Sequence, residues 1–319
     1  MAFIAPHPLL EGNTVYVLGA GASSEYEIPC GDRLADMVSS WVAGFDRNRP
    51  EVHALRHVPQ PTLDKIRIFA RAIRGIGNAD LFLAQNPDLR EAGRLCLART
   101  IAQHENPDRL SGGWYRQLFR SMLPDDVASA RPLDLVKSAV AFITFNYDRS
   151  LEQALYEHTR AFFRRSPQEE CVKALASIPI IHVHGQLGRL PWQMDSESLD
   201  GIPVRDYSPS LGLEDFLAGS PIKITEETEP ASREYEIAHH LLLKAKQIHF
   251  LGFGFHPANL LRLRFGAGMS RVPISGTHQG LGHSRRQELE KSGGEFGIPI
   301  SLGTYPETVA DYFHHVIGG

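Results

Sequence analysis

Two polar residues, Asn146 and His184, have side chains suited to handling a proton on a hydroxyl group or on a water molecule. An imidazole titrates near neutral pH, so His184 could accept a proton at pH 7. The amide of Asn146 can both donate and accept a hydrogen bond. Both residues lie at or just beyond the end of a predicted strand, where a side chain can reach a ligand bound at the edge of a sheet.

A glycine-rich turn near the N-terminus could bind an anion. Val15-Tyr16-Val17-Leu18 is typical of a buried strand, and Gly19-Ala20-Gly21-Ala22-Ser23-Ser24 follows it. Glycines let the backbone turn sharply and approach a ligand, and the free N–H groups at the start of a helix favour phosphate. A tight turn without a ligand would show the same pattern, so both interpretations stay open.

Each candidate side chain also has a purely structural explanation. Asn146 and Asp148 could cap the helix that begins near Ser150, as Asn and Asp often do. Strand alternation predicts that His182 and His184 share one side of a strand, where both could be buried core histidines. Simple turns or ordinary strand ends would equally explain four later residues: Gly252, Gly254, Ser275 and Thr277.

Six strand-like segments end in glycine or polar residues, as expected of a parallel sheet that carries a ligand site. Their alternation with helical segments predicts a Rossmann-like, doubly wound parallel α/β sheet of about six strands. Ligands of such sheets lie beyond the carboxyl ends of the strands, so these ends should converge. They are Gly19–Ser24, Asn146–Asp148, His184-Gly185, Gly252–Phe255, Ser275–Thr277 and Gly303-Thr304.

The chain is predicted to form a single domain, residues 1–319, with two additions. Residues 48–132 show helical periodicity and no credible strand, so we expect a helical insertion there. Residues 186–230 are rich in proline, glycine, serine and acidic residues, and we expect a long loop excursion over the active face. The strands expected after the first are 139–145, 178–185, 247–255, 272–277 and 298–302, and a last helix is expected at 306–317.

Composition excludes several classes of function. The formal net charge of −4 gives no basic surface for nucleic acid, so no direct nucleic-acid binding is expected. Cys30, Cys96 and Cys171 form no C-x-x-C pair, and no metal site is expected. No apolar run approaches the roughly 20 residues that span a bilayer, and the N-terminus lacks signal-peptide features. We therefore expect a cytoplasmic protein without a membrane segment.

Four motifs, in this order, resemble the sirtuin (silent information regulator) superfamily. They are Gly19-Ala20-Gly21-Ala22-Ser23, Thr144-Phe145-Asn146-Tyr147-Asp148, His182-Val183-His184-Gly185 and Gly252-Phe253-Gly254-Phe255. The chain looks most similar to the prokaryotic sirtuin-like NAD+ hydrolases that act as effectors in antiphage defence. The resemblance covers about residues 13–21 and 139–319, and the helical segment between them carries no recognisable motif.

This resemblance implies NAD+ as the substrate and gives each residue a role. Sirtuins bind NAD+ and break the bond between nicotinamide and ribose. By the resemblance, Asn146 and Asp148 line the nicotinamide-ribose pocket, and His184 is the general base on a ribose hydroxyl or on water. The Asp148 carboxylate could stabilise the oxocarbenium-like transition state. The diphosphate would be held by Gly19, Ala20, Gly21 and Ser23, with further contacts to NAD+ from Thr144, Gly252, Gly254, Ser275 and Thr277.

The chain departs from the deacylase branch of this superfamily. It lacks the four-cysteine zinc module, and Ile28-Pro29-Cys30-Gly31-Asp32-Arg33 keeps the Ile-Pro of the family but not its Asp-Phe-Arg. Without the zinc module, a deacylase loses the cleft that holds an acyl-lysine peptide, and water becomes the more plausible acceptor. We therefore predict an NAD+ glycohydrolase that releases nicotinamide and ADP-ribose and uses no metal.

Such an activity needs control, because unregulated NAD+ hydrolysis would kill the cell that makes the enzyme. We expect control through homo-oligomerisation or through a separate sensor or activator protein, with residues 48–132 and 186–230 as contact surfaces. The alternatives are an ADP-ribosyltransferase or deacylase of the same family, and a non-enzymatic sensor of NAD+ or ADP-ribose. A conventional dehydrogenase is disfavoured, because no strand ending in Asp or Glu follows the glycine turn by about twenty residues.

Overall fold

The computed structural model describes residues 13–44, 58–76, 79–193, 202–210, 214–217, 222–224, 232–303 and 308–317. One six-stranded sheet has the order β3-β2-β1-β4-β5-β6, and every neighbouring pair is parallel. This is the order of a doubly wound Rossmann fold, so the predicted fold class is confirmed. The strands are β1 (Thr14–Leu18), β2 (Val140–Thr144), β3 (Ile180–His182), β4 (Gln247–Leu251), β5 (Ile274–Gly276) and β6 (Ser301–Leu302).

β1 lies at the centre of the sheet and fixes the level at which its neighbours end. Leu18, the last residue of β1, is in register with Thr144 of β2 and with Leu251 of β4. From β1 the chain adds β2 and β3 on one side of the sheet and then β4, β5 and β6 on the other. A crevice opens between β1 and β4, where the direction of strand addition reverses in doubly wound folds. The loops that follow these three strands therefore meet at one edge of the sheet.

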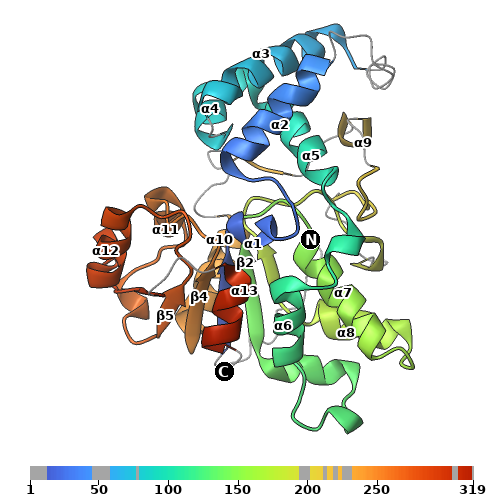
Figure 1. Cartoon of the computed structure of the whole chain (residues 1–319), viewed down its shortest axis with the longest axis vertical. Helices are drawn as coiled ribbons and strands as arrows, with labels where there is room; N and C mark the ends of the chain where they lie inside the picture. Colours follow the sequence, from blue (N-terminus) through green and yellow to red (C-terminus); the bar gives the residue numbers. More distant parts are fainter. Residues whose placement is uncertain are drawn as a thin grey trace.

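Two hydrophobic cores cover the two faces of the sheet. Tyr16 and Phe142 belong to the core formed with α6 (Gly113–Ser121), α7 (Ser150–Phe162), α8 (Gln168–Ala176) and α13 (Val309–Tyr312). Their sequence neighbours Val15 and Ile143 belong to the core formed with α10 (Arg233–Lys244), α11 (Pro257–Arg262) and α12 (His283–Ser292). Successive strand residues point to opposite faces, so strands buried on both faces must be apolar throughout. Figure 1 shows α7 and α8 on one side of the sheet and α11 and α12 on the other.

A third core lies in a group of helices at one end of the molecule (Figure 1). Val38, Phe69 and Leu97 are among its buried residues. We call this group the helical layer; it consists of α2 (Gly31–Ala43), α3 (Gln60–Ile76), α4 (Ala79–Gln85) and α5 (Arg90–Ala102).

The segment 48–132, expected as one helical insertion, is divided between two cores. Its helices α3, α4 and α5 join α2 in the helical layer, whereas α6 packs on the sheet. Trp114 of α6 donates from Nε1 to the Ala22 carbonyl at 2.8 Å, and the Tyr115 N–H donates to Tyr26 Oη at 2.9 Å. Helical periodicity predicts a helix with one buried face but does not say which layer that face covers. Residues 48–57 and 77–78 lie outside the described residues.

The segment 186–230, expected as a long loop excursion, is described at 186–193, 202–210, 214–217 and 222–224. It includes one short α-helix, α9 (Glu214–Leu217). Leu187, Phe216 and Ile222 are buried in the core of the helical layer. These residues pack against the helical layer, whereas Leu190 and Tyr207 of the same segment are buried in the core that α6, α7, α8 and α13 form on the sheet.

Several strands end earlier than their apolar pattern predicts. β4 ends at Leu251 because Gly252 takes a φ of +56°, which turns the chain, and β3 ends at His182 before Gly185 takes a φ of +73°. The helix after the first glycine turn, α1 (Gly21–Ser24), has only four residues. The expected helix at 306–317 is described as α13 followed by a π-helical turn, Phe313–Ile317.

Helix α8 was not expected, because its buried face is limited to Cys171, Ala174 and Leu175. Its five apolar residues all lie within positions 171–176, too short a stretch for a clear helical period. No described helix has both the length and the apolar composition that crossing a bilayer requires.

Candidate functional site

A cavity of about 310 Å³ lies between the carboxyl ends of the strands and the helical layer. This volume is within the usual range for small-molecule sites. The lining residues from the sheet side are Gly19, Ala20, Phe145, Asn146, Tyr147, Asp148, His184, Phe253 and Gly254, with Asn259 of α11. Those from the helical layer and the loop before it are Ile28, Pro29, Cys30, Gly31, Leu34, Ala35, Ala79, Asp80, Leu97 and Ile101.

The floor of the cavity depends on a close crossing of two glycine turns. The Gly21 N–H donates to the Gly252 carbonyl at 3.0 Å, and the Gly19 N–H donates to the Leu251 carbonyl at 3.0 Å. A Cβ atom on Gly252 would lie 2.0 Å from the Ala22 nitrogen. Only residues without a Cβ allow the turns after β1 and β4 to approach this closely.

This crossing bears on the predicted phosphate contacts of Gly19 and Gly21. The N–H groups of Gly19 and Gly21 are hydrogen-bonded within the protein and cannot hold a diphosphate without a rearrangement. Helix α1 has four residues, too short for a substantial helix dipole. Ala20 is exposed and lines the cavity, so it is the member of the turn best placed to meet a ligand.

Asn146 is held in place by its amide nitrogen. Nδ2 donates to the Gly19 carbonyl and to Ser23 Oγ, each at 3.0 Å, and the Asn146 backbone N–H donates to Thr144 Oγ1 at 3.0 Å. Among the described residues, the buried Oδ1 atom has no hydrogen-bond partner. A buried amide oxygen without a partner is costly, so this atom is a natural acceptor for a hydroxyl group or a water in the cavity.

Asp148 lines the cavity and also contacts the first residue of the helix that follows. Its Oδ1 accepts from the Ser150 N–H at 3.1 Å and from the Ser150 hydroxyl. The N-cap residue of α7 is Arg149, without a side-chain cap, so Asp148 forms a local turn before the helix and is not its N-cap. Burial raises the pKa of this carboxyl, and the hydrogen bonds from Ser150 and Ser23 oppose the rise.

His184 lines the cavity beyond the end of β3. Its Nε2 lies 3.4 Å from Tyr235 Oη of α10, and its ring meets Phe145 edge to face. Burial, together with the charges of Arg262 and Lys223, lowers its pKa to about 4. At pH 7 the imidazole is neutral, so it can accept a proton, although it is a weaker base than a free histidine.

His182 and His184 do not share one side of the strand as alternation predicted. His182 Nε2 contacts Glu152 of α7 at 2.6 Å, whereas His184 contacts Tyr235 of α10, and these two helices cover opposite faces of the sheet. The strand ends at His182, and the turn that begins at Val183 breaks the alternation. Of the two histidines, only His184 lines the cavity.

The other predicted contacts do not line the cavity. Ser23 and Thr144 both bond to Asn146. Thr277 Oγ1 accepts from the Gly252 N–H at 2.8 Å. Ser275 accepts from Tyr312 Oη at 2.6 Å on the sheet face that α13 covers. Among the twelve predicted residues, those that line the cavity are Gly19, Ala20, Asn146, Asp148, His184 and Gly254.

No sequence pattern predicted that the helical layer closes the cavity. Asp80 of α4 lies 3.4 Å from Tyr147 Oη, and the same hydroxyl donates to the Lys223 carbonyl at 3.1 Å. These contacts join residues far apart in the chain, and no local pattern encodes them. The loop Ile28–Gly31 could have been found, because its Ile-Pro pair lies in the stretch after the glycine turn that was compared with a known motif.

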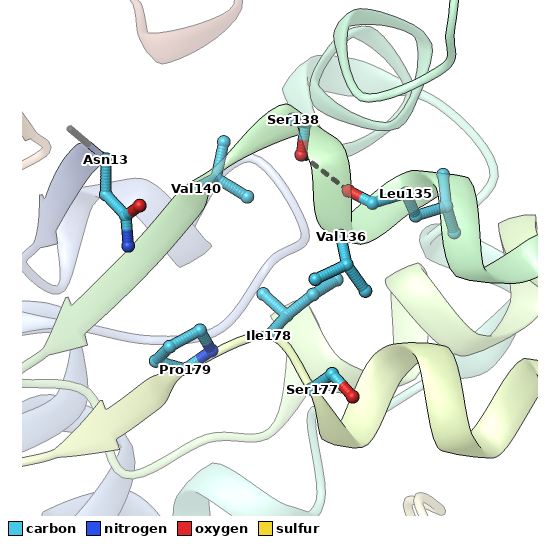
Figure 2. Close-up of a pocket in the computed structure, with 8 residues that line it drawn as sticks. All are labelled: Asn13, Leu135, Val136, Ser138, Val140, Ser177, Ile178 and Pro179. Carbon is cyan, nitrogen blue, oxygen red and sulfur yellow. Dashed lines mark hydrogen bonds between the residues drawn. The ribbon is translucent and has the colours of Figure 1, made fainter. Parts of the chain in front are cut away.

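A second hollow lies at the opposite edge of the sheet and is too small to compete with the cavity. It measures about 10 Å³, which is room for a single water at most. Figure 2 shows its lining where β1, β2 and β3 begin, with Asn13, Val140 and Pro179 around it. The buried Asn13 Oδ1 has no partner among the described residues, so a bound water would satisfy it. No group of three or more His, Cys, Asp or Glu side chains in the described ranges could hold a metal ion.

Comparison with known proteins assigns no family to the chain. No family model matches, and no curated protein matches. One similar solved structure is described as "The Structural basis for Sirtuin Substrate affinity", with a TM-score of 0.38, 13% identity and coverage of 97% of this chain and 93% of that one. Another is "Crystal structure of a Sir2 homolog-NAD complex", with a TM-score of 0.41, 16% identity and coverage of 97% and 91%. Similarity at this level does not establish an activity.

Proposed function

We propose that the protein is an NAD+ glycohydrolase, which uses water to cleave NAD+ into nicotinamide and ADP-ribose. The observation that carries this proposal is that Asn146, Asp148 and His184 line one cavity beyond the carboxyl ends of the strands. These are the three residues to which the sequence resemblance assigns the reaction. They come from segments almost forty residues apart, and the fold brings them together.

The proposed reaction breaks the bond between C1′ of the ribose and the nicotinamide nitrogen. The bonding electrons leave with nicotinamide, water adds its oxygen to C1′, and one proton of that water is released. The neutral imidazole of His184 can take up this proton, because one of its two ring nitrogens carries no hydrogen at pH 7. The products are nicotinamide, ADP-ribose and one proton, so atoms and charge balance.

Asn146 and Asp148 have complementary parts in this proposal. Oδ1 of Asn146, which no other described residue contacts by a hydrogen bond, would accept one from a ribose hydroxyl or from the attacking water. Asp148, when ionised, would stabilise the positive charge that develops on the ribose ring. Its carboxylate is fixed by Ser150, so it need not reorganise as that charge forms.

A non-enzymatic sensor of NAD+ or ADP-ribose is the second candidate, and one observation favours it. A pKa of about 4 makes His184 a weak base at neutral pH, and a binding protein needs no base at all. Turnover distinguishes the two candidates directly.

We further propose that the hydrolase is a regulated effector in antiphage defence, controlled by homo-oligomerisation or by a separate sensor protein. The support is the sequence resemblance and the need to protect the host cell's NAD+. The helical layer and segment 186–230 are the proposed contact surfaces. ADP-ribose transfer and deacylation remain alternatives that product analysis tests.

The experiment incubates the full chain with NAD+ and follows nicotinamide and ADP-ribose by chromatography, while calorimetry measures NAD+ binding. Asn146→Ala and His184→Ala should abolish turnover, and His240→Ala is the matched control because His240 is exposed on α10. The hydrolase is supported if the wild type and His240→Ala release nicotinamide and ADP-ribose and the other two variants do not. NAD+ binding without turnover, even after addition of extract from infected cells, would replace the hydrolase with the sensor.

A further inference from the structure

His182 lies behind the cavity wall, and both of its ring nitrogens face hydrogen-bond acceptors. Nδ1 lies 2.9 Å from the backbone carbonyl oxygen of Asn146, and Nε2 lies 2.6 Å from Glu152 Oε1. The side chains of His182 and Glu152 are 8% and 3% exposed. The pair is therefore shielded from solvent and directly joined to a residue of the proposed site.

The chemistry of these partners determines which ring nitrogens of His182 carry a hydrogen. A carbonyl oxygen can only accept, so Nδ1 must carry a hydrogen. A carboxylate also only accepts, so an ionised Glu152 requires a second hydrogen on Nε2. With both hydrogens the ring is an imidazolium cation, and an oppositely charged carboxylate at 2.6 Å stabilises it.

The charges around His182 agree with this protonation. Burial alone would lower its pKa, but the Glu152 carboxylate, the Asn146 carbonyl and the nearby Asp148 charge together raise it above the usual value. His184, two residues later, faces Tyr235, Arg262 and Lys223, and its pKa falls to about 4. The pKa values of these two histidines are thus shifted in opposite directions, as expected where one site separates a charged role from a neutral one.

His182 completes the immobilisation of Asn146. The backbone N–H of Asn146 is bound by Thr144, its Nδ2 by Gly19 and Ser23, and its carbonyl by His182. Oδ1 is the polar atom of this residue that has no partner among the described residues. Because every other polar atom of Asn146 is hydrogen-bonded, the direction in which Oδ1 points is fixed.

We propose that His182 and Glu152 form an imidazolium–carboxylate pair that positions Asn146 through its backbone carbonyl. His182 is a positioning residue, since it does not line the cavity. The effect on turnover rests on the proposed hydrolase, but the protonation and the hold on Asn146 do not. The pair therefore has a readout in the resting protein as well as in the reaction.

Nitrogen-15 NMR of the full chain with labelled histidine and asparagine tests the pair without substrate. The expected wild-type spectrum shows both His182 ring nitrogens at imidazolium shifts at pH 7. In Glu152→Gln, the ring should become neutral with its hydrogen on Nδ1, because a glutamine amide can donate to Nε2 and leave the bond to Asn146 intact. Glu157→Gln is the control, the same change on the same helix at a half-buried residue bonded to Gln153. A neutral His182 in the wild type would overturn the proposal.

A double variant, His182→Phe with Glu152→Leu, tests the hold on Asn146. It replaces a buried ion pair with apolar groups, an exchange that is often neutral for stability, and thermal unfolding confirms the fold. The side-chain amide resonances of Asn146 should move, and kcat should fall roughly 10- to 100-fold with KM changed little, as expected for a misplaced group. Unchanged amide resonances in the folded variant contradict the proposal. If the wild type does not hydrolyse NAD+, the proposed function fails, and the amide resonances alone decide the role of the pair. If the double variant does not fold, the wild-type and Glu152→Gln spectra still decide whether His182 and Glu152 form the imidazolium–carboxylate pair.

Discussion

Replacing Gly252 with alanine should destabilise the protein far more than the same change at Gly254, two residues away. At φ +56°, an L-residue is strained by about 1–2 kcal/mol. The new Cβ would lie 2.0 Å from the Ala22 nitrogen, so the turn after β1 must move by roughly 1 Å or more to restore van der Waals contact. That movement breaks two hydrogen bonds, from Gly21 N–H to the Gly252 carbonyl and from Gly252 N–H to Thr277 Oγ1, each contributing about 0.5–1.5 kcal/mol.

The expected loss for Gly252→Ala is therefore roughly 2–5 kcal/mol in the free energy of unfolding. Gly254→Ala is the control, because a Cβ there meets nothing within 4 Å and its φ is not in the left-handed region. Its expected change is within about 0.5 kcal/mol of zero. Urea denaturation followed by circular dichroism measures both. If the two variants unfold at the same urea concentration, the glycine crossing does not determine the approach of the two turns.

Three further predictions concern charge and access. Arg149→Met should lower the free energy of unfolding in urea by roughly 3–5 kcal/mol, because it leaves Glu105 buried and unpaired. Adding Glu105→Leu should recover most of this loss, and no recovery would contradict this account. The pKa of His184 is about 6.5 in the unfolded chain and about 4 in the folded protein. Between these pH values the unfolded chain binds a proton that the folded protein does not bind. The free energy of unfolding should therefore fall by roughly 3 kcal/mol as the pH drops from about 7 to 4. His184→Gln should remove that part of the pH dependence, and an unchanged stability curve would refute the assignment. Cys30 lines the cavity while the other two cysteines are buried, so NAD+ should slow maleimide labelling at Cys30 if the cavity binds it; equal rates would place NAD+ elsewhere.

The sheet could be predicted because its information is local. Val15 to Leu18 and Val140 to Ile143 are continuous apolar runs, as strands buried on both faces require, and the helices between them keep their 3.6-residue period. The approximate ends of the strands then place Asn146, Asp148 and His184 at one edge without any knowledge of their contacts. The structure agrees with that placement, since all three line the same cavity.

The use of the glycine N–H groups could not be predicted, because it depends on a partner far along the chain. Gly19 and Gly21 have the pattern of a phosphate-binding turn, yet their N–H groups are bonded to Leu251 and Gly252, more than 200 residues away. The same limit applies to α6, whose apolar face fits a helical layer as well as a sheet. Tyr26, which bonds α6 to the first turn, carries no local sign of that contact.

His182 and His184 show that the position at which a strand ends can override the alternating pattern in deciding which face of the sheet a side chain meets. Extended backbone through His184 would have placed both rings on the face that α7 covers, beside the Glu152 carboxylate, and that anion would have favoured a proton on both. Because β3 stops at His182, the turn carries the next ring to Tyr235 and to the positive charges of Arg262 and Lys223. The point at which β3 ends therefore decides which face of the sheet each histidine meets, and with it the direction in which its pKa shifts.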